Sequence, residues 1–334
     1  MSVRDLIIVG AGPSGLSAAI AAKRRGLDYQ VLEQGTLVNS IYRFPPQMIF
    51  FTTPELLEVG GLPFVSPYEK PTRAEALRYY RRVVDTYDLQ IAFDETVRSI
   101  QVEEDPSINA GGADNRVFAI ETGSRGGRRI RQARMVVLAI GYFDRPNRLD
   151  VPGEDLPHVR HFHGEPHPFY RQRVVIVGGG NSAAESALDL FRAGAAVTLV
   201  HRRADLKPTI KYWVRPDIEN RIKEGSIAAR FNTCVAEIRP TSVVVRSGAD
   251  VEELAADAVF LLVGYHADWD LMAAAGVVMN ERRVPAYDPT TFETNVPGLF
   301  VAGGALAGMD TGNIFIENGR FHGETIVEVI ASRR

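Results

Sequence analysis

The chain has 334 residues, more than a typical single domain, so its length predicts two domains that each bury a core. Its formal net charge of -3 gives no overall basic field, which argues against nucleic acid as a partner. The apolar stretch at residues 6–9 is too short for a secretory signal, and no uninterrupted apolar run reaches membrane-spanning length. We therefore expect a cytoplasmic protein without membrane attachment. The single cysteine, Cys234, excludes an intrachain disulfide, a CxxC redox pair and a cysteine-based zinc site.

The N-terminal residues carry the pattern of a nucleotide-binding βαβ unit. Residues 5–9, apolar from Leu6 onward, predict a buried strand, and the segment Gly10-Ala11-Gly12-Pro13-Ser14-Gly15 follows it directly. Small apolar residues then predict a helix that ends near Gly26, and a second strand at 29–32 ends at Glu33. This order of strand, GxGxxG loop, helix and acidic strand end is typical of a dinucleotide site.

The same pattern recurs 168 positions later. Residues 174–177 predict a strand, Gly178-Gly179-Gly180-Asn181-Ser182-Ala183 a glycine-rich loop, and the following residues a helix that ends near Gly194. The next strand, at 197–200, ends at His201. A single GxGxxG is weak evidence, but two copies in one register predict two nucleotide sites, each with phosphate at a helix N-terminus.

The ends of the second strands distinguish the two nucleotides. Glu33 can accept hydrogen bonds from both ribose hydroxyls of FAD or NAD, and its charge repels a 2′-phosphate. In the second unit, Arg202 and Arg203 follow His201, and guanidinium groups bind a 2′-phosphate through charge-assisted hydrogen bonds. The sequence therefore assigns an unphosphorylated nucleotide to the first unit and NADPH to the second.

With these motifs in place, the chain resembles the thioredoxin-reductase-like flavoproteins over nearly its whole length. Residues 136–141 and 261–264 resemble the family's strand ends before the domain crossings, and residues 296–303 resemble the strand that leads to the flavin. Segments 40–42, 50–51, 179–183 and 309–323 are most similar to the bacillithiol disulfide reductase (YpdA-type) family, the last of them to its C-terminal helix. The resemblance implies an α/β fold with two Rossmann-like domains, FAD in the first site and NADPH in the second.

The motifs and the resemblance together give two sets of expected cofactor-binding residues. For FAD they are Gly10, Gly12, Pro13, Ser14, Gly15, Glu33, Gln34, Tyr42, Gly141, Gly303, Asp310, Asn313 and Ile314. For NADPH they are Gly178, Gly180, Asn181, Ser182, Ala183, His201, Arg202, Arg203 and Gly264. Hydride transfer belongs to the cofactors, so no side chain is assigned a catalytic role.

The chain departs from the family at two positions. Where the family has Gly-Asp, with the aspartate on the flavin ribityl chain, this sequence has Gly303-Gly304, and we expect Asp310 to substitute. Where the YpdA-type family has its redox cysteine, this sequence has Ser14, which cannot form a mixed disulfide. Cys234 lies far from any flavin motif in the sequence and is interpreted as a packed structural thiol.

The domain arrangement implied by the family is discontinuous. We expect residues 1–150 and 280–334 to form the FAD domain and residues 151–279 the NADPH domain, with crossings near 151–154 and 284–285. A homodimer is also implied by the resemblance. The arginine-rich residues 125–134 and the polar segment 103–115 predict solvated connections.

The predicted function is NADPH-dependent reduction of FAD and then of a small-molecule or protein acceptor. The acceptor remains open among a low-molecular-weight disulfide such as bacillithiol disulfide, ferredoxin or flavodoxin, and a small oxidant. One alternative is a flavin monooxygenase, because Phe162 and Gly164 fit the FxGxxxH signature, although His167 falls one position early. Another is a non-enzymatic redox sensor. Four histidines at positions 158, 161, 163 and 167 lie on an extended, proline-rich path, and we expect no metal site there.

Overall fold

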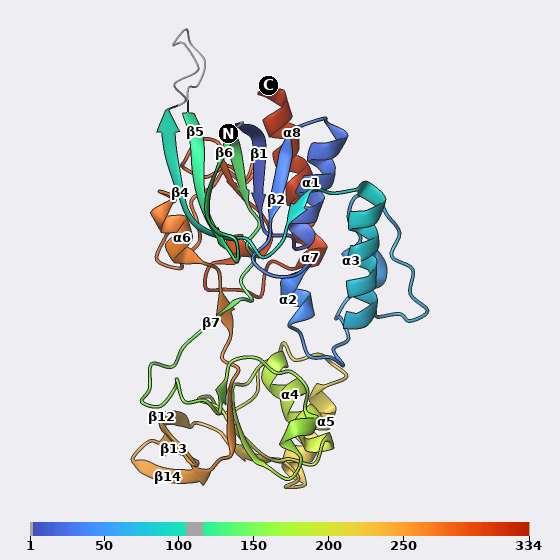
Figure 1. Ribbon diagram of the computed structural model, residues 1–334. Helices are drawn as coiled ribbons and strands as arrows, with labels where there is room; N and C mark the ends of the chain where they lie inside the picture. Colours follow the sequence, from blue (N-terminus) through green and yellow to red (C-terminus); the bar gives the residue numbers. More distant parts are fainter. Residues whose placement is uncertain (1–2, 105–115, 334) are drawn as a thin grey trace. The chain divides into compact units, whose positions relative to one another are not determined.

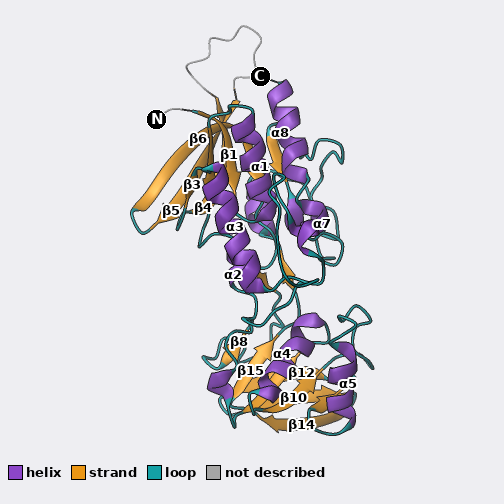
Figure 2. Cartoon of the chain, turned by 90° about the vertical axis from the view of Figure 1, so that its right-hand side faces the viewer, coloured by secondary structure: helices purple, strands orange, loops and turns teal. Residues whose placement is uncertain are grey.

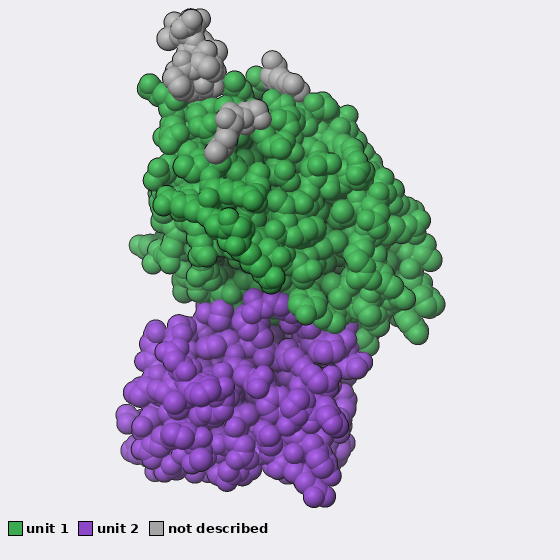
Figure 3. Space-filling view, viewed as in Figure 1, with its two compact units in different colours: residues 1–42, 49–145, 265–334 green, residues 43–48, 146–264 purple. Residues whose placement is uncertain are grey.

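The computed structural model describes residues 3–104 and 116–333, so most of the connection expected at 103–115 lies outside the described residues. Figure 3 shows two compact units: unit 1 comprises Met1–Tyr42, Ile49–Arg145 and Tyr265–Arg334, and unit 2 comprises Arg43–Met48 and Pro146–Gly264. The expected NADPH domain, residues 151–279, includes residues 265–279. They belong to unit 1 because α6 (Trp269–Ala274) buries Leu271 and Met272 in the core of that unit.

Unit 1 is built on a seven-stranded sheet (Figure 1). Its strands are β1 (Arg4–Val9), β2 (Tyr29–Leu32), β3 (Ile91–Ala92), β4 (Thr96–Glu104), β5 (Arg116–Ser124), β6 (Gly127–Leu138) and β17 (Leu299–Val301). They are ordered β3-β2-β1-β6-β5-β4, and β17 also pairs with β6. The pairings of β1, β2, β3, β6 and β17 are parallel, whereas β4, β5 and the first half of β6 form an antiparallel meander. One long strand, β6, thus belongs to both parts.

Helices pack on the parallel part of this sheet. The helix α1 (Pro13–Arg24) connects β1 to β2, and α8 (His322–Ser332) lies beside it in both ribbon views (Figures 1 and 2). The other helical elements of unit 1 are α2 (Asn39–Tyr42), η1 (Pro54–Leu57), α3 (Arg73–Tyr87), η3 (Gly303–Ala307) and α7 (Ile316–Gly319). The helix α3 begins with a capping box in which Thr72 and Glu75 bond reciprocally, satisfying backbone N–H groups that a helix start leaves without partners.

Unit 2 repeats the same plan. Its parallel sheet has the order β11 (Ala228–Arg230), β10 (Ala196–Val200), β9 (Arg173–Val177), β15 (Ala258–Leu261) and β8 (Val159–Arg160). An antiparallel sheet of β12 (Cys234–Arg239), β13 (Ser242–Ser247) and β14 (Asp250–Ala255) packs against one face of this sheet. The helices α4 (Asn181–Arg192) and α5 (Arg215–Lys223) pack against the other, and a single turn, η2 (His167–Phe169), precedes β9.

The predicted internal repeat is confirmed in detail. The helix α4 begins and ends 168 positions after α1, and each of these helices connects the central strand of a parallel sheet to its neighbour. Each unit also carries an antiparallel meander beside the parallel strands. The expected fold of two Rossmann-like α/β domains is therefore confirmed.

Two of the chain's passages between the units, at 145–146 and 264–265, are adjacent through strand pairing, and the short segment Arg43–Met48 gives two more. The strands β7 (Arg145–Pro146) and β16 (Tyr265–His266) pair with each other. Immediately inside unit 2, the Asn147 N–H donates a hydrogen bond to the Gly264 carbonyl at 2.9 Å. In the described part of the chain, no helix is long and apolar enough to cross a membrane.

Candidate functional site: two glycine-loop sites

The first glycine loop is shaped by close backbone contacts. A Cβ at Gly10, which has φ +105°, or at Gly15 would overlap a carbonyl oxygen, that of Ala139 or of Gly10 respectively. Gly12 faces open space, with no atom within 4 Å of a Cβ built there. Pro13 is the first residue of α1. The backbone N–H groups of the first turn of this helix, which have no partner within the helix, therefore lie beside this space. This geometry suits a pyrophosphate held at a helix N-terminus.

Glu33 closes the same loop from the end of β2. Its side chain is only 5% exposed, and its two carboxylate oxygens accept hydrogen bonds from the Ala11 N–H at 2.8 Å and the Gly35 N–H at 2.9 Å. Burial raises the pKa of Glu33, while these two N–H groups act in the opposite direction. Each oxygen keeps acceptor capacity beyond these bonds, as recognition of a ribose diol requires.

Two further expected FAD residues lie at the edge of this region. The Gln34 side chain donates to an oxygen of Asp144 at 3.1 Å, and Asn39 donates to the other oxygen of the same carboxylate at 3.2 Å. Tyr42, the last residue of α2, is 55% exposed. The Arg73 guanidinium lies over its ring and donates to its carbonyl oxygen.

The carboxyl ends of β6 and β17 bring a second group of expected residues together. Gly141 has φ +60° and faces open space, and Gly303, just after β17, has φ +64°. A Cβ at Gly303 would overlap the Ser14 hydroxyl, and one at Gly319 would lie 3.3 Å from it. The Gly303 N–H donates to Nδ1 of His322 at 3.1 Å. Ser14 therefore lies against the turn where the sequence lacks the family's aspartate.

The segment after this turn differs from the expected continuous helix. Residues 309–315 form a loop, α7 has four residues, and α8 begins at His322. The physical reason is the Asn318 side chain, which donates to the Asn313 carbonyl and accepts from the Phe315 N–H, so that helix starts only at Ile316. The Asp310 carboxylate accepts from the Gly312 N–H at 3.3 Å and the Asn313 side chain at 3.0 Å, whereas Ile314 packs against the core.

The second glycine loop repeats the close contacts of the first, and an additional segment, residues 207–211, is hydrogen-bonded to it. A Cβ at Gly178 would lie 2.5 Å from the Leu262 carbonyl oxygen, and Ala183 is fully buried beneath the loop. The Asn181 side chain accepts from the Lys211 N–H at 2.8 Å and donates to the Thr209 carbonyl at 3.0 Å. Segment 207–211 is thereby tied to the start of α4, where Ser182 is exposed.

Positive charge gathers beside this loop. Arg202 and Arg203 are exposed directly after β10, whereas His201 is buried, and its ring would overlap a Cβ at Gly179. Burial, followed by the charges of Arg203 and Arg202, lowers the pKa of His201, so the ring is neutral at pH 7.

Sequence reasoning missed a third cation, Lys207. Its Cδ lies 3.6 Å from a Cβ built on Gly180, and its N–H donates to the Gly179 carbonyl at 2.8 Å. Its position six residues after His201 was the available signal. Gly264, which has φ +105°, lies by contrast at the last position of unit 2, next to Asn147.

The histidine-rich segment of unit 2 has structural partners. His163 is buried and lies 3.1 Å from Asp189 of α4, and His161 lies 3.9 Å from Glu154. His167 is exposed in η2. Among residues 3–104 and 116–333, no group of three or more His, Cys, Asp or Glu side chains could hold a metal ion.

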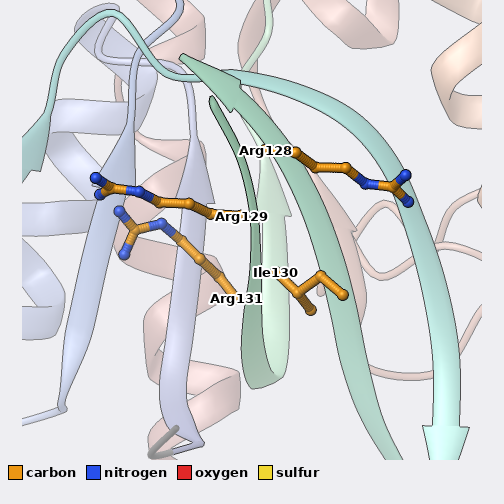
Figure 4. A pocket seen from close by; sticks show the side chains of 4 residues that line it. All are labelled: Arg128, Arg129, Ile130 and Arg131. Atoms are coloured by element: carbon orange, nitrogen blue, oxygen red, sulfur yellow. The ribbon is translucent and has the colours of Figure 1, made fainter. Parts of the chain in front are cut away.

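The hairpin of β5 and β6 carries a hollow lined by Arg128, Arg129, Ile130 and Arg131, in which Arg129 and Arg131 extend to one side of β6 and Arg128 to the other (Figure 4). Arg128 pairs with Glu121, and Arg131 makes a two-pronged ion pair with the buried Glu95. Two of the three arginines that line the hollow are thus paired with an acidic side chain, which agrees with the expected solvated hairpin.

The residues present fit the two cofactors implied by the motifs. In unit 1, the open cradle at Gly12 and the buried carboxylate of Glu33 suit a dinucleotide without a 2′-phosphate. In unit 2, the strand end carries Arg202, Arg203 and Lys207, a donor set suited to a 2′-phosphate. These residues would hold FAD and NADPH respectively.

Comparison with known proteins agrees with this architecture. Residues 7–303 match the family model described as pyridine nucleotide-disulphide oxidoreductase. The chain is 40% identical over 329 residues to bacilliredoxin reductase Bdr of Bacillus subtilis (strain 168), covering 98% of this chain and 97% of that protein. The solved bacillithiol disulfide reductase Bdr (YpdA) of Bacillus cereus superposes with a TM-score of 0.94 at 37% identity, and that of Staphylococcus aureus with 0.91 at 36%. Both cover 100% of each chain.

The match spans both glycine loops and both units, and the predicted resemblance to the YpdA-type proteins is confirmed, with Ser14 at the position expected to hold a cysteine. The chain belongs to the pyridine nucleotide-disulphide oxidoreductase family and is an FAD- and NADPH-dependent flavoprotein oxidoreductase.

Proposed function

We propose that the protein reduces a low-molecular-weight disulfide, such as bacillithiol disulfide, or the disulfide of a small redox protein, and that it does so without a thiol of its own. The observation that carries this proposal is Ser14, which lies at the start of α1 against Gly303 and Gly319. The only cysteine of the sequence, Cys234, is exposed at the start of β12 in unit 2, so the expectation that it is packed is wrong. Full-length similarity to a bacilliredoxin reductase supports a disulfide as the acceptor.

The overall reaction balances with the cofactors alone. One disulfide, one NADPH and one proton give two thiols and one NADP⁺, so two electrons move and one S–S bond breaks. When bound, FAD supplies the two-electron relay between NADPH and the acceptor. An enzyme dithiol is not required by this stoichiometry.

The side chains of the protein bind and orient the cofactors in this proposal. Glu33 and the start of α1 hold the adenosine and pyrophosphate of FAD, the latter through free N–H groups. Arg202, Arg203 and Lys207 hold the 2′-phosphate of NADPH and thereby select it over NADH. The buried His201 supports the second glycine loop from below.

Without an enzyme cysteine, ferredoxin, flavodoxin and small oxidants are rival acceptors, and monooxygenation and redox sensing are rival functions. The experiment that separates them starts from the FAD-loaded protein under anaerobic conditions. NADPH oxidation is followed while bacillithiol disulfide, an oxidised bacilliredoxin, ferredoxin and a quinone are offered one at a time. We expect turnover with a disulfide, accompanied by two thiols per NADPH consumed. Turnover with ferredoxin or quinone alone would overturn the proposal.

A Ser14→Cys variant tests whether disulfide reduction needs a thiol at this position. If the disulfide is reduced without an enzyme thiol, the parent protein turns over after treatment with an alkylating reagent, because no thiol near the flavin is needed. A Cys234→Ser variant is the matched control and should keep full activity. If only Ser14→Cys reduces the disulfide, the parent protein is not a disulfide reductase.

We also propose that the protein is a homodimer, as the family resemblance implies, and that it acts in the cytoplasm, where NADPH is available. Light scattering of the purified protein checks the dimer. A monomeric mass at micromolar concentration would contradict it.

A further inference from the structure

Tyr142 occupies the space in front of the Gly303-Gly304 turn. A Cβ built on Gly304 would lie 2.7 Å from Cδ1 and 2.9 Å from Cε1 of the tyrosine ring. Ordinary contact distances begin near 3.4 Å, so Gly304 cannot carry a side chain while this ring keeps its place. The Tyr142 ring thus occupies the space that an acidic side chain at position 304 would need.

The topology of unit 1 indicates what passes this point. The strands β1, β6 and β17 are parallel neighbours, so their carboxyl ends meet at one edge of the sheet. The chain runs from β1 to β2 on one side and continues through β6 on the other, which makes this edge the switch point where open α/β sheets bind ligands. With the adenosine end at Glu33 on β2, the remainder of a dinucleotide extends toward β6 and β17. Tyr142 and Gly304 follow those two strands.

The Tyr142 hydroxyl is available for a ligand. The ring packs partly against the core of unit 1, yet its hydroxyl makes no hydrogen bond within residues 3–104 and 116–333. The hydroxyl oxygen is not enclosed by the described residues, so a ligand can reach it. Burial, and secondarily the charge of Glu317, raise the pKa of Tyr142, so the phenol keeps its proton at neutral pH and acts as a donor.

We propose that Tyr142 is an FAD-binding residue whose hydroxyl donates a hydrogen bond to the flavin-side half of FAD, and that Gly304 is required because the ring fills the space of its side chain. The inference rests on the assignment of FAD to the glycine loop of unit 1. It replaces Asp310, whose carboxylate is bonded within its own loop, as the polar group that compensates for the missing aspartate.

The first test compares FAD affinity in two phenylalanine variants of the apoprotein. Tyr142→Phe keeps the ring and removes only the hydroxyl, and we expect the Kd for FAD, measured by quenching of flavin fluorescence, to rise about threefold to tenfold for one lost hydrogen bond. Tyr287→Phe is the matched control, because Tyr287 packs against the same core and stacks on Phe292. An unchanged Kd in Tyr142→Phe overturns the inference.

A double-mutant cycle tests the link to Gly304. Gly304→Ala forces the ring aside, so we expect it to raise the Kd for FAD at least as much as Tyr142→Phe does. In a Tyr142→Ala background the overlap is gone, and adding Gly304→Ala should change the Kd by less than twofold. Equal effects of Gly304→Ala in both backgrounds would contradict the coupling. Thermal unfolding of each apoprotein identifies variants that lose the fold, for which Tyr142→Phe remains the deciding measurement.

Failure of this inference is distinguishable from failure of the proposed function. If the parent protein does not bind FAD, the assignment of the unit 1 site fails and the inference fails with it. If the parent binds FAD and reduces no disulfide, only the proposed acceptor is wrong. If the parent binds FAD and the Tyr142→Phe variant binds it equally well, only the inference is wrong.

Discussion

The imidazole of His201 lies against Gly179 so closely that a Cβ at position 179 would overlap its ring atoms. The second glycine loop is thereby supported by a buried side chain from the end of β10. We expect Gly179→Ala to push this ring out of place and to destabilise unit 2 by about 1–3 kcal/mol, the usual cost of overpacking. Urea denaturation measures the effect.

The neighbouring position provides a matched control for that experiment. A Cβ at Gly180 would meet only Lys207, at 3.6 Å, so Gly180→Ala should leave the free energy of unfolding almost unchanged. It should instead weaken NADPH binding, since the second glycine allows close approach of the pyrophosphate. Equal stability losses in both variants would contradict the interpretation.

The choice of NADPH over NADH should depend on Arg202 and Arg203. Replacing either by alanine removes charge-assisted hydrogen bonds to the 2′-phosphate, and we expect kcat/KM for NADPH to fall about 10- to 100-fold. The value for NADH should change little, because NADH lacks that phosphate. Steady-state kinetics with both nucleotides checks this, and parallel losses for the two would show that the arginines act through the fold instead.

FAD retention should depend on the carboxylate of Glu33. Glu33→Gln places an amide NH₂ against the N–H of Ala11 or Gly35, each of which now bonds to a carboxylate oxygen. We expect a loss of about 1–3 kcal/mol in FAD binding, because the amide NH₂ replaces an oxygen that accepts from a ribose hydroxyl. Isothermal titration of the apoprotein measures it, with Glu103→Gln as a control at an exposed carboxylate on β4.

His322 predicts a pH dependence of stability. Its Nδ1 accepts the Gly303 N–H and its ring stacks on Phe292 at 4.2 Å, and burial lowers its pKa below 6.5. The neutral ring is favoured in the folded state, so its contribution is complete above the unfolded pKa. It is lost as the pH falls below about 6.5, where the unfolded state gains a proton first.

A His322→Phe variant isolates this contribution, because it keeps the stacked ring but cannot accept the hydrogen bond. The difference in unfolding free energy between parent and variant should be largest near neutral pH and should shrink toward about pH 5. Denaturant unfolding at several pH values gives the difference directly. A constant difference over this range would rule out the role of the Nδ1 lone pair.

The βαβ units were predictable because backbone sterics leave few choices. Gly10 and Gly15 each approach a carbonyl oxygen too closely for a Cβ. The GxGxxG pattern is therefore almost sufficient to predict the local backbone geometry. Glu33 and Arg202 follow strands of known length, which fixes their place at the sheet edge. Local rules of this kind are readable from a single sequence.

Features that depend on distant contacts were not predictable in the same way. The Tyr142 ring excludes a side chain at Gly304, 162 positions away in the sequence, only because β6 and β17 pair in one register. Residues 265–279 join unit 1 because α6 finds its apolar partners there. The helix expected over 309–323 is interrupted by the hydrogen bonds of Asn318, whose side chain competes with the backbone.

The hydrogen bond between Asn147 and Gly264 brings together the two ends of the longer segment of unit 2, Pro146–Gly264. This segment, which carries the second glycine loop and its parallel sheet, therefore has its two ends at adjacent backbone positions. A segment with adjoining ends can be excised and the flanking chain rejoined by a linker of a few residues, with Arg43–Met48 left in the remaining chain. Each half can then be prepared and titrated with its own nucleotide, and transplanted between relatives to exchange nucleotide preference.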